Sequence, residues 1–254
     1  MQKQDKSECY GRNNETKINI PRYLYHYSSF RNLENILANN TIYFQRPYEV
    51  NDPFDCKLHP SFGKNDEDRA TAHLSWDSYR KRIGLFCLSE VNNDILMWSH
   101  YGDKHRGVVL QFDGRWLLNN FKNLKPVEYH EDWPEIGYYN TVWDRTFRKG
   151  FGKRTAELEE LETIVFLRKA LHWCYEYEWR IVLEENGFVS IDSSALTAVI
   201  LGCKMGDADC EKAEEYRGKY GKENIELFKA RECPNRYCLE ITPISGGQNS
   251  DARI

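Results

Sequence analysis

Two segments of this sequence place titratable side chains inside runs of aromatic and β-branched residues. They are Tyr25-His26-Tyr27-Ser28 and Glu176-Tyr177-Glu178-Trp179-Arg180-Ile181. Burying a polar group without a partner costs roughly 2–7 kcal/mol, so such groups are expected to pair with one another or to bind a ligand. In an extended strand His26 and Ser28 share one face, and so do Glu178 and Arg180. The two segments therefore predict either an internal ion-pair network or a functional site.

Each candidate residue has a structural and a chemical interpretation. His26 and Ser28 together could exchange hydrogen bonds with one small polar ligand; alternatively, His26 is a core histidine bonded to a backbone carbonyl. Glu178 beside a polar pocket could stabilise positive charge that develops on a substrate. Its alternative is a buried ion pair with Arg180, with Trp179 pointing the other way into the core.

The segment from Met97 to Tyr101 is expected to end a short helix. Tyr101 could stack on a ligand ring while its hydroxyl reaches a polar partner, or it could simply belong to the core. Neither His100 nor His105 has a Cys or His companion at the spacing of a zinc-binding helix motif, so no metal site is predicted. The eight cysteines lack CxxC pairs and are expected to be reduced thiols.

Composition limits the class of protein. The 254 residues are 41% hydrophobic with a net charge of −4, which is typical of a globular chain and argues against a surface devoted to nucleic acid. No run approaches the ~20 apolar residues of a spanning helix, and residues 1–17 lack the apolar stretch of a secretory signal. We therefore expect a cytoplasmic protein without membrane contact. The sequence does not indicate an oligomeric state.

The periodicities predict one α+β domain over residues 21–245, between a flexible arm at 1–20 and a disordered tail at 246–254. Strands are expected at 23–27, 41–45, 83–88, 108–112, 177–183, 196–201, 225–229 and 237–244. Helices are expected after Ser28 or Ser29, over an exposed segment at 64–82, and at 92–101, 156–173 and 208–220. Asn51-Asp52-Pro53-Phe54-Asp55 predicts a turn. A cationic loop is expected around Arg148.

Several motifs together resemble a bacterial family known only as a domain of unknown function. The motifs are Leu24-Tyr25-His26-Tyr27-Ser28, Asn51-Asp52-Pro53-Phe54-Asp55, Phe86-Cys87-Leu88-Ser89, Leu96-Met97-Trp98-Ser99-His100-Tyr101, His105-Arg106-Gly107-Val108, Tyr175-Glu176-Tyr177-Glu178-Trp179-Arg180-Ile181 and Ile200-Leu201-Gly202-Cys203-Lys204. The resemblance covers about residues 22–245. The family name supplies no chemistry.

The order of elements is also similar to the ADP-ribosyltransferase superfamily. In that superfamily a first strand with His-x-Ser/Thr precedes a helix of the form N-L-x-x-I-L, as Asn32-Leu33-Glu34-Asn35-Ile36-Leu37 does here. The resemblance implies mixed and antiparallel split sheets with flanking helices, and NAD held in a cleft between them.

The same resemblance implies roles for individual residues. His26 would bond the nicotinamide ribose, Ser28 the carboxamide, and Tyr101 would stack on nicotinamide. Glu178 would hold the ribose hydroxyl and stabilise the oxocarbenium-like transition state. Arg180 is included among the cofactor-binding residues, although it could instead pair with Glu178.

These observations predict an NAD-dependent ADP-ribosyltransferase-like protein, a toxin or phage-defence effector. Its target would be an acidic macromolecule, protein or nucleic acid, contacted by the cationic loop. The first alternative is a non-enzymatic ligand- or partner-binding domain. The second is a nuclease or hydrolase that uses His26, His100 or His105 with an acid.

Overall fold

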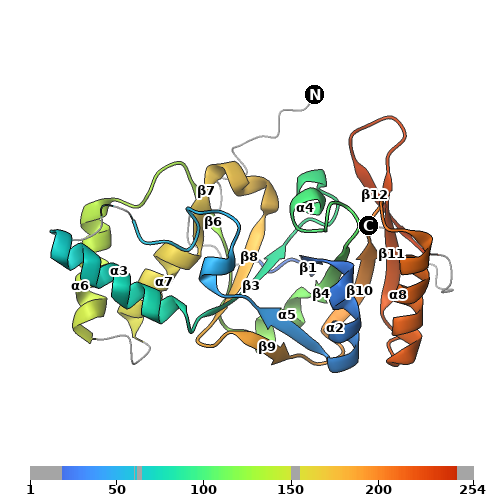
Figure 1. The fold of residues 1–254 in the computed structure, drawn as a ribbon, viewed down its shortest axis with the longest axis horizontal. Coiled ribbons are helices and arrows are strands. Elements are labelled where there is room, and N and C mark those ends of the chain that lie inside the picture. The colour runs from blue at the N-terminus through green and yellow to red at the C-terminus, as the bar shows by residue number, and fades with distance from the viewer. Residues whose placement is uncertain (1–18, 60, 62–64, 150–154, 245–254) are drawn as a thin grey trace. The chain divides into compact units, whose positions relative to one another are not determined.

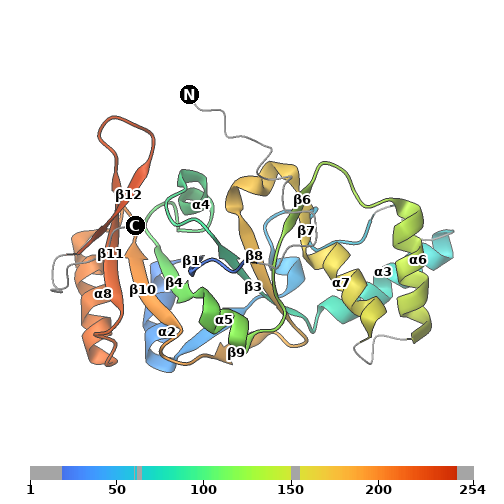
Figure 2. The same ribbon diagram turned by 180° about the vertical axis from the view of Figure 1, so that it is seen from behind.

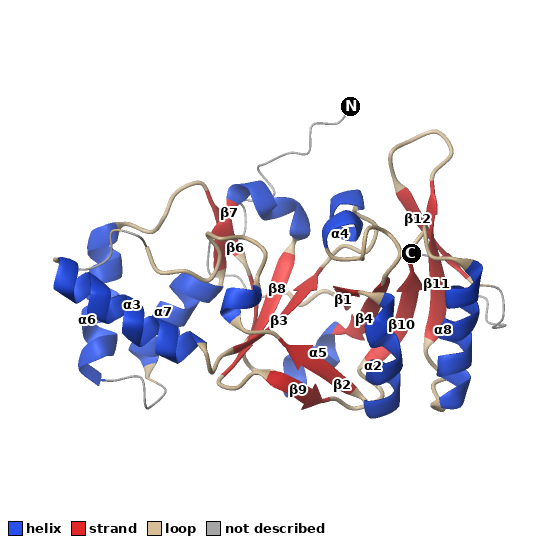
Figure 3. Ribbon diagram, in the orientation of Figure 1, coloured by secondary structure: helices blue, strands red, loops and turns tan. Residues whose placement is uncertain are grey.

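The computed structural model describes residues 19–59, 61, 65–149 and 155–244, and combines helices with a mixed β-sheet and smaller separate sheets (Figures 1 and 3). The predicted α+β fold class is therefore confirmed. Within the domain the chain forms two compact units. Unit 1 contains residues 43–87 and 123–187, and unit 2 contains residues 19–42, 88–122 and those from 188 onward. The predicted tail and all but the last two residues of the predicted arm lie outside the described residues.

Three helices build the core of unit 1. They are α3 (Asp66–Arg80), α6 (Ile136–Lys149) and α7 (Ala156–Phe166). Asn65 caps α3 by accepting a hydrogen bond from the Asp68 amide at 2.8 Å. The segment is helical as predicted, but the expectation that it is exposed fails on one face, where Trp76 retains only 1% of its accessible surface. Its indole packs against Phe166 at the end of α7.

Helix α7 ends seven residues earlier than the apolar pattern predicted. After Phe166 the chain forms β7 (Arg168–Ala170), which pairs in parallel with β6 (Glu128–His130), and then the 3-10 helix η3 (Leu171–Glu176). The Glu128 amide donates to the Leu167 carbonyl at 2.8 Å, so strand pairing replaces the next helical hydrogen bond. This change of backbone turns Lys169 into the protein interior.

Strand β8 (Glu178–Leu183) lies between β3 (Gly84–Ser89) and β5 (Leu124–Pro126). It begins one residue later than predicted, because Tyr177 adopts the left-handed conformation with φ of 44°. The predicted cationic loop is also wrong: Arg145 and Arg148 belong to α6. Arg145 pairs with Glu160 of α7 at 2.9 Å, and the predicted cluster members Lys153 and Arg154 lie outside the described residues.

Unit 2 contains five consecutive strands of the eight-stranded sheet, in the order β12-β11-β10-β4-β1. Its strands are β1 (Tyr23–Ser28), β4 (Val108–Asp113), β10 (Leu196–Leu201), β11 (Glu226–Glu232) and β12 (Leu239–Pro243). All neighbours are antiparallel except β10 and β11, which are parallel. Helices α2 (Leu33–Asn39) and α8 (Asp207–Lys219) lie side by side in both views (Figures 1 and 2). Glu34 links them by accepting from the Lys219 ammonium at 3.0 Å.

The remaining short elements complete the chain. They are η1 (Phe30–Asn32), β2 (Thr41–Phe44), η2 (Pro47–Glu49), α4 (Ile95–His100), α5 (Gly114–Asn120) and β9 (Gly187–Ser190). Among the described residues no helix is long and apolar enough to cross a membrane.

Candidate functional site

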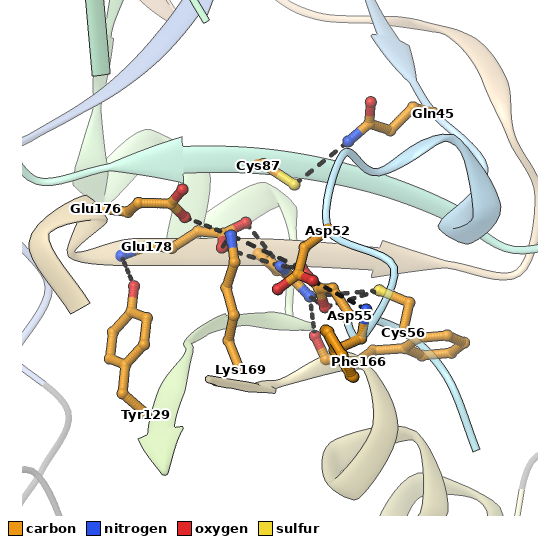
Figure 4. A network of polar contacts seen from close by, with 12 residues as sticks. Gln45, Asp52, Asp55, Cys56, Cys87, Tyr129, Phe166, Lys169, Glu176 and Glu178 are labelled. Carbon is orange, nitrogen blue, oxygen red and sulfur yellow. Dashed lines mark hydrogen bonds and ion pairs between the residues drawn. The ribbon is translucent and has the colours of Figure 1, made fainter. Parts of the chain in front are cut away.

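A cluster of charged side chains lies buried in unit 1 around Glu178 and Arg180 (Figure 4). It contains Asp55, Lys169, Glu176, Glu178 and Arg180, which we call the ion-pair network. Arg180 retains 1% of its accessible surface and Glu178 5%, so neither group meets bulk water. Counted as ionised, three carboxylates against two cations leave one net negative charge.

Arg180 uses every N–H of its guanidinium inside the protein. Its Nε donates to Glu178 Oε1 at 2.8 Å, and its Nη2 donates to Glu178 Oε2 at 2.9 Å and Asp55 Oδ2 at 2.5 Å. Its Nη1 donates to Asp55 Oδ1 at 2.9 Å and to the Phe166 carbonyl at 2.7 Å. Because a guanidinium carries five N–H donors, Arg180 has none left for a ligand.

Glu178 is saturated in the same way. Its carboxylate accepts from Arg180 at both oxygens, from Lys169 Nζ at 3.1 Å, and from the Cys87 thiol. Burial alone would raise the pKa of Glu178, but the charges of Arg180 and Lys169 outweigh it and hold that pKa well below its usual range. Since a carboxylate offers about four lone-pair sites, all of them are used by the protein.

Lys169 completes the network from β7. Its ammonium bonds Glu176 and Glu178, and lies 3.7 Å from Asp55 Oδ2. Burial would lower the pKa of Lys169, but the surrounding carboxylates, Glu178 foremost, raise it above its usual value. Lys169 and Glu178 are therefore fixed charges near neutral pH, and neither is poised to exchange a proton there.

Local backbone geometry places each member. Asp55 is the last residue of the predicted turn, in which the Phe54 amide donates to Asp52 Oδ1 at 2.9 Å. Glu176 closes η3, and the left-handed Tyr177 redirects the chain so that β8 starts at Glu178. The Glu178 amide in turn donates to the Tyr129 hydroxyl at 2.8 Å.

Sequence reasoning found Glu178 and Arg180 but missed Lys169 and Asp55. Lys169 lies in a stretch whose apolar spacing predicts an amphipathic helix. In such a helix a lysine gives no sign of burial. The only signal for Asp55 was its turn motif, which indicated conformation and gave no sign of burial.

The other predicted site residues lie in unit 2. His26 and Ser28 are on β1, opposite Leu110 and Val108 of β4. The buried Ser28 hydroxyl accepts from Asn32 Nδ2 at 3.0 Å. Tyr101 is half-buried and ends α4, with its ring centroid 6.1 Å from that of His100. Among the predicted site residues, Glu178 thus forms an ion pair with Arg180, and His26 and Ser28 lie two residues apart on the same strand.

Unit 2 also contains a hollow of about 660 Å³ near the carboxyl ends of β10 and β11. Its lining includes His105, Cys203, Lys204, Glu232, Arg236 and the Cys233–Cys238 disulfide. The expectation that all cysteines are reduced is therefore wrong for this pair. In the described part of the chain no group of three or more His, Cys, Asp or Glu side chains could hold a metal ion.

A thiol and an imidazole meet in this hollow. Cys203 Sγ lies 3.7 Å from His105 Nδ1. Burial raises the pKa of the Cys203 thiol, and burial followed by the charge of Lys204 lowers the pKa of His105. His105 is the last of three consecutive residues with positive φ, after Asp103 and Lys104. Such backbone is strained for non-glycine residues, by the order of 1–3 kcal/mol each.

Comparison with known proteins gives one match. The model of a family described as a protein of unknown function (DUF2971) matches residues 97–181, which include Tyr101, Lys169, Glu178 and Arg180. The predicted resemblance to a family of unknown function is supported over that range. Neither the curated proteins nor the solved structures gave a match, so nothing in these comparisons supports the likeness to ADP-ribosyltransferases.

Proposed function

We propose that this protein is a ligand-binding domain without catalytic activity at Glu178, and that its binding site is the hollow in unit 2. The observation that carries the proposal is the saturation of Glu178 and Arg180. Every donor of Arg180 and every acceptor position of Glu178 is bonded within the protein. A catalytic carboxylate needs a free position aimed at the substrate. Here the carboxylate supports the fold.

The hollow has the features of a binding place. Its volume of about 660 Å³ lies within the range of ligand sites. It presents cationic, acidic, imidazole and sulfur groups together, whereas the ion-pair network presents no free group.

The decisive experiment measures nicotinamide release from NAD, with and without cell lysate, by the wild type and by Glu178→Gln. We expect no release by either protein and a clear loss of stability in the variant. A matched control is Glu160→Gln, because Glu160 pairs with Arg145 at the surface. Release by the wild type that disappears in a folded Glu178→Gln protein would overturn the proposal.

ADP-ribosyl transfer is the second candidate. The order of elements favours it, because His26 and Ser28 on β1 precede α2 as the resemblance implies. In addition, the Ser28 hydroxyl accepts a hydrogen bond from Asn32, the first residue of the N-L-x-x-I-L segment. For this chemistry a ribose hydroxyl must displace Lys169 or Cys87 from Glu178. NAD would be the substrate and an acidic macromolecule the acceptor. Charge reversal at Arg145 and Arg148 of α6 should then weaken target modification while leaving NAD binding unchanged.

A further inference from the structure

A disulfide, two cationic side chains and one carboxylate line the same hollow of unit 2. The disulfide joins Cys233 to Cys238, the cations are Lys204 and Arg236, and the carboxylate is Glu232. We propose that the hollow binds a small anionic thiol, which opens the Cys233–Cys238 disulfide by thiol–disulfide exchange. The inference rests on the proposed function, because it names the class of ligand for the same hollow.

The disulfide lies where a small molecule can reach it. Cys233 and Cys238 are half-buried, and the residues between them, 234–237, are all exposed. These residues form the loop between β11 and β12, which projects from the sheet in both views (Figures 1 and 2). The hollow beside the disulfide, about 660 Å³, has room for a small ligand. Exposed disulfides are more easily reduced than buried ones and include those that take part in exchange.

The hairpin does not depend on this disulfide. Strands β11 and β12 are paired up to Glu232 and Leu239, the residues that flank the two cysteines. The Cys233 amide also donates to the Cys238 carbonyl at 3.0 Å. A cross-link over so short a loop restrains little chain, because its entropic effect grows with the length of the loop. We therefore expect the exchange to take place in the folded protein.

The charges around the disulfide favour an anion. Lys204 and Arg236 are exposed and contribute two positive charges, against one negative charge from Glu232. Burial, followed by the charge of Lys204, lowers the pKa of His105, so its imidazole adds no charge at neutral pH. The lining thus has one net positive charge, which attracts both the anionic group of the ligand and its thiolate.

The two sides of the hollow act on each other electrostatically. Glu232 directly precedes Cys233 on the side of the disulfide, whereas Cys203 and Lys204 lie on the other side, after β10. Burial raises the pKa of Cys203, and the charge of Glu232 raises it further, against the opposite effect of Lys204. A ligand in the hollow therefore meets the charge of Lys204 and the disulfide in one space.

The exchange balances in atoms and electrons. The ligand thiolate attacks one sulfur of the disulfide, a new S–S bond forms between ligand and protein, and the Cys233–Cys238 bond breaks. The displaced cysteine leaves as a thiolate and takes a proton from solvent, which replaces the proton that the ligand thiol lost. A second ligand molecule then attacks the mixed disulfide. The products are two protein thiols and the disulfide of the ligand, so the protein is reduced and the ligand oxidised.

The test compares three small thiols that differ in charge: anionic mercaptoethanesulfonate, neutral mercaptoethanol and cationic cysteamine. The full chain is treated with each thiol, quenched with acid and alkylated with a maleimide in denaturant. Mass spectrometry then gives the rate at which each chain gains two labelled cysteines. Each rate is divided by that of the same thiol with bis(hydroxyethyl) disulfide at the same pH, which removes differences in thiol pKa and nucleophilicity.

We expect the anionic thiol to open the disulfide about 10-fold faster than the cationic thiol, at the lower end of the range for electrostatic steering. High salt should reduce this preference, because the charges are exposed. Equal relative rates for the three thiols would overturn the inference. A disulfide that opens only when the protein is unfolded would also overturn it.

Substitutions in the lining should change the preference for the anionic thiol in opposite directions. Lys204→Met and Arg236→Met should each reduce it about threefold, since two cations share the effect, whereas Glu232→Gln should increase it. The matched control is Lys212→Met, because Lys212 is exposed on α8, pairs with Asp209 and lies outside the lining. An unchanged preference in all three lining variants, with circular dichroism spectra that match the wild type, would contradict the proposed ligand.

The outcome is separable from that of the proposed function. Equal rates for the three thiols together with absence of nicotinamide release remove the thiol ligand and leave the binding domain. Nicotinamide release that depends on Glu178 removes the binding-domain function whatever the exchange rates show.

Discussion

The ion-pair network of unit 1 and the hollow of unit 2 contain similar chemical groups in opposite circumstances. Both combine acidic and basic side chains, and each has a thiol beside them, Cys87 at the network and Cys203 in the hollow. In the network, Arg180 and Glu178 are buried and all their hydrogen-bonding positions are filled. In the hollow, Lys204 and Glu232 are exposed and the lining encloses a space of about 660 Å³.

The difference shows that a cluster of titratable residues is not evidence of catalysis by itself. Both burial and a strongly shifted pKa are usual signs of an active site, and Glu178 has both. What distinguishes a site is an unfilled position that a ligand can take. By that criterion the hollow is the stronger candidate, although its pKa shifts are smaller.

The largest effect should come from Arg180→Met. The substitution leaves Asp55 and Glu178 buried without their guanidinium, which should lower the free energy of unfolding by about 3–5 kcal/mol in urea denaturation. Arg145→Met is the matched control, since Arg145 pairs with Glu160 at the surface and should contribute under about 1 kcal/mol. Similar losses in both variants would mean that the network is no more stabilising than a surface ion pair.

Glu178→Gln should cost about 1.5–3 kcal/mol at neutral pH, the range for a lost charge-assisted hydrogen bond. It should also change the dependence of stability on acid. The folded-state pKa of Glu178 is lowered, so its stabilisation is complete above the ordinary glutamate pKa, about 4.3, and is lost as pH falls below that value toward the folded pKa. Unfolding measured from pH 7 to pH 3 should therefore show a shallower decline in the variant than in the wild type. Parallel curves would count against an ionised, paired Glu178.

The substitution Gly202→Ala should disturb the structure of the hollow more than that of the ion-pair network. The added methyl group would overlap the His105 carbonyl oxygen, at a cost of about 1–3 kcal/mol, and should displace Cys203 from His105. Gly218→Ala in α8 is the control, because a Cβ there meets nothing within 4 Å and helix propensity favours alanine. Thermal unfolding of both variants would show whether the close backbone approach matters.

Lys204→Met should have the smallest effect on stability, within about 0.5 kcal/mol, because the side chain is exposed. Removing the positive charge of Arg180 should lower the free energy of unfolding several times more. If the two substitutions destabilise the protein equally, the distinction between a saturated network and an accessible hollow fails.

The sequence predicted most of the elements because local patterns determine them. The alternation from Tyr23 to Tyr27 predicted β1, the apolar run from Leu196 to Leu201 predicted β10, and the Asp52 turn formed as its chemistry requires. It also raised the possibility of the Glu178–Arg180 ion pair, which the structure contains.

What the sequence could not predict depends on contacts between distant residues. Asp55 and Arg180 are 125 positions apart, and no local pattern reports that they meet. The early end of α7 likewise follows from pairing of β7 with β6, since the apolar periodicity continues past Phe166. The disulfide between Cys233 and Cys238 depends on the β11–β12 hairpin bringing them to a Cα separation of 5.4 Å.

The alternation of Glu178 and Arg180 on β8 also has a consequence for how the chain folds. β8 pairs with β5 so that Arg180 faces Lys125 and Ile181 faces Leu124. A shift of one residue along β5 would turn both charged side chains to the opposite face of the sheet and put Trp179 in their place. Asp55 and Lys169 would then be buried without their partners. The charged side chains thus disfavour misaligned pairing of β8 during folding, because a misaligned β8 loses an entire set of ion pairs at once.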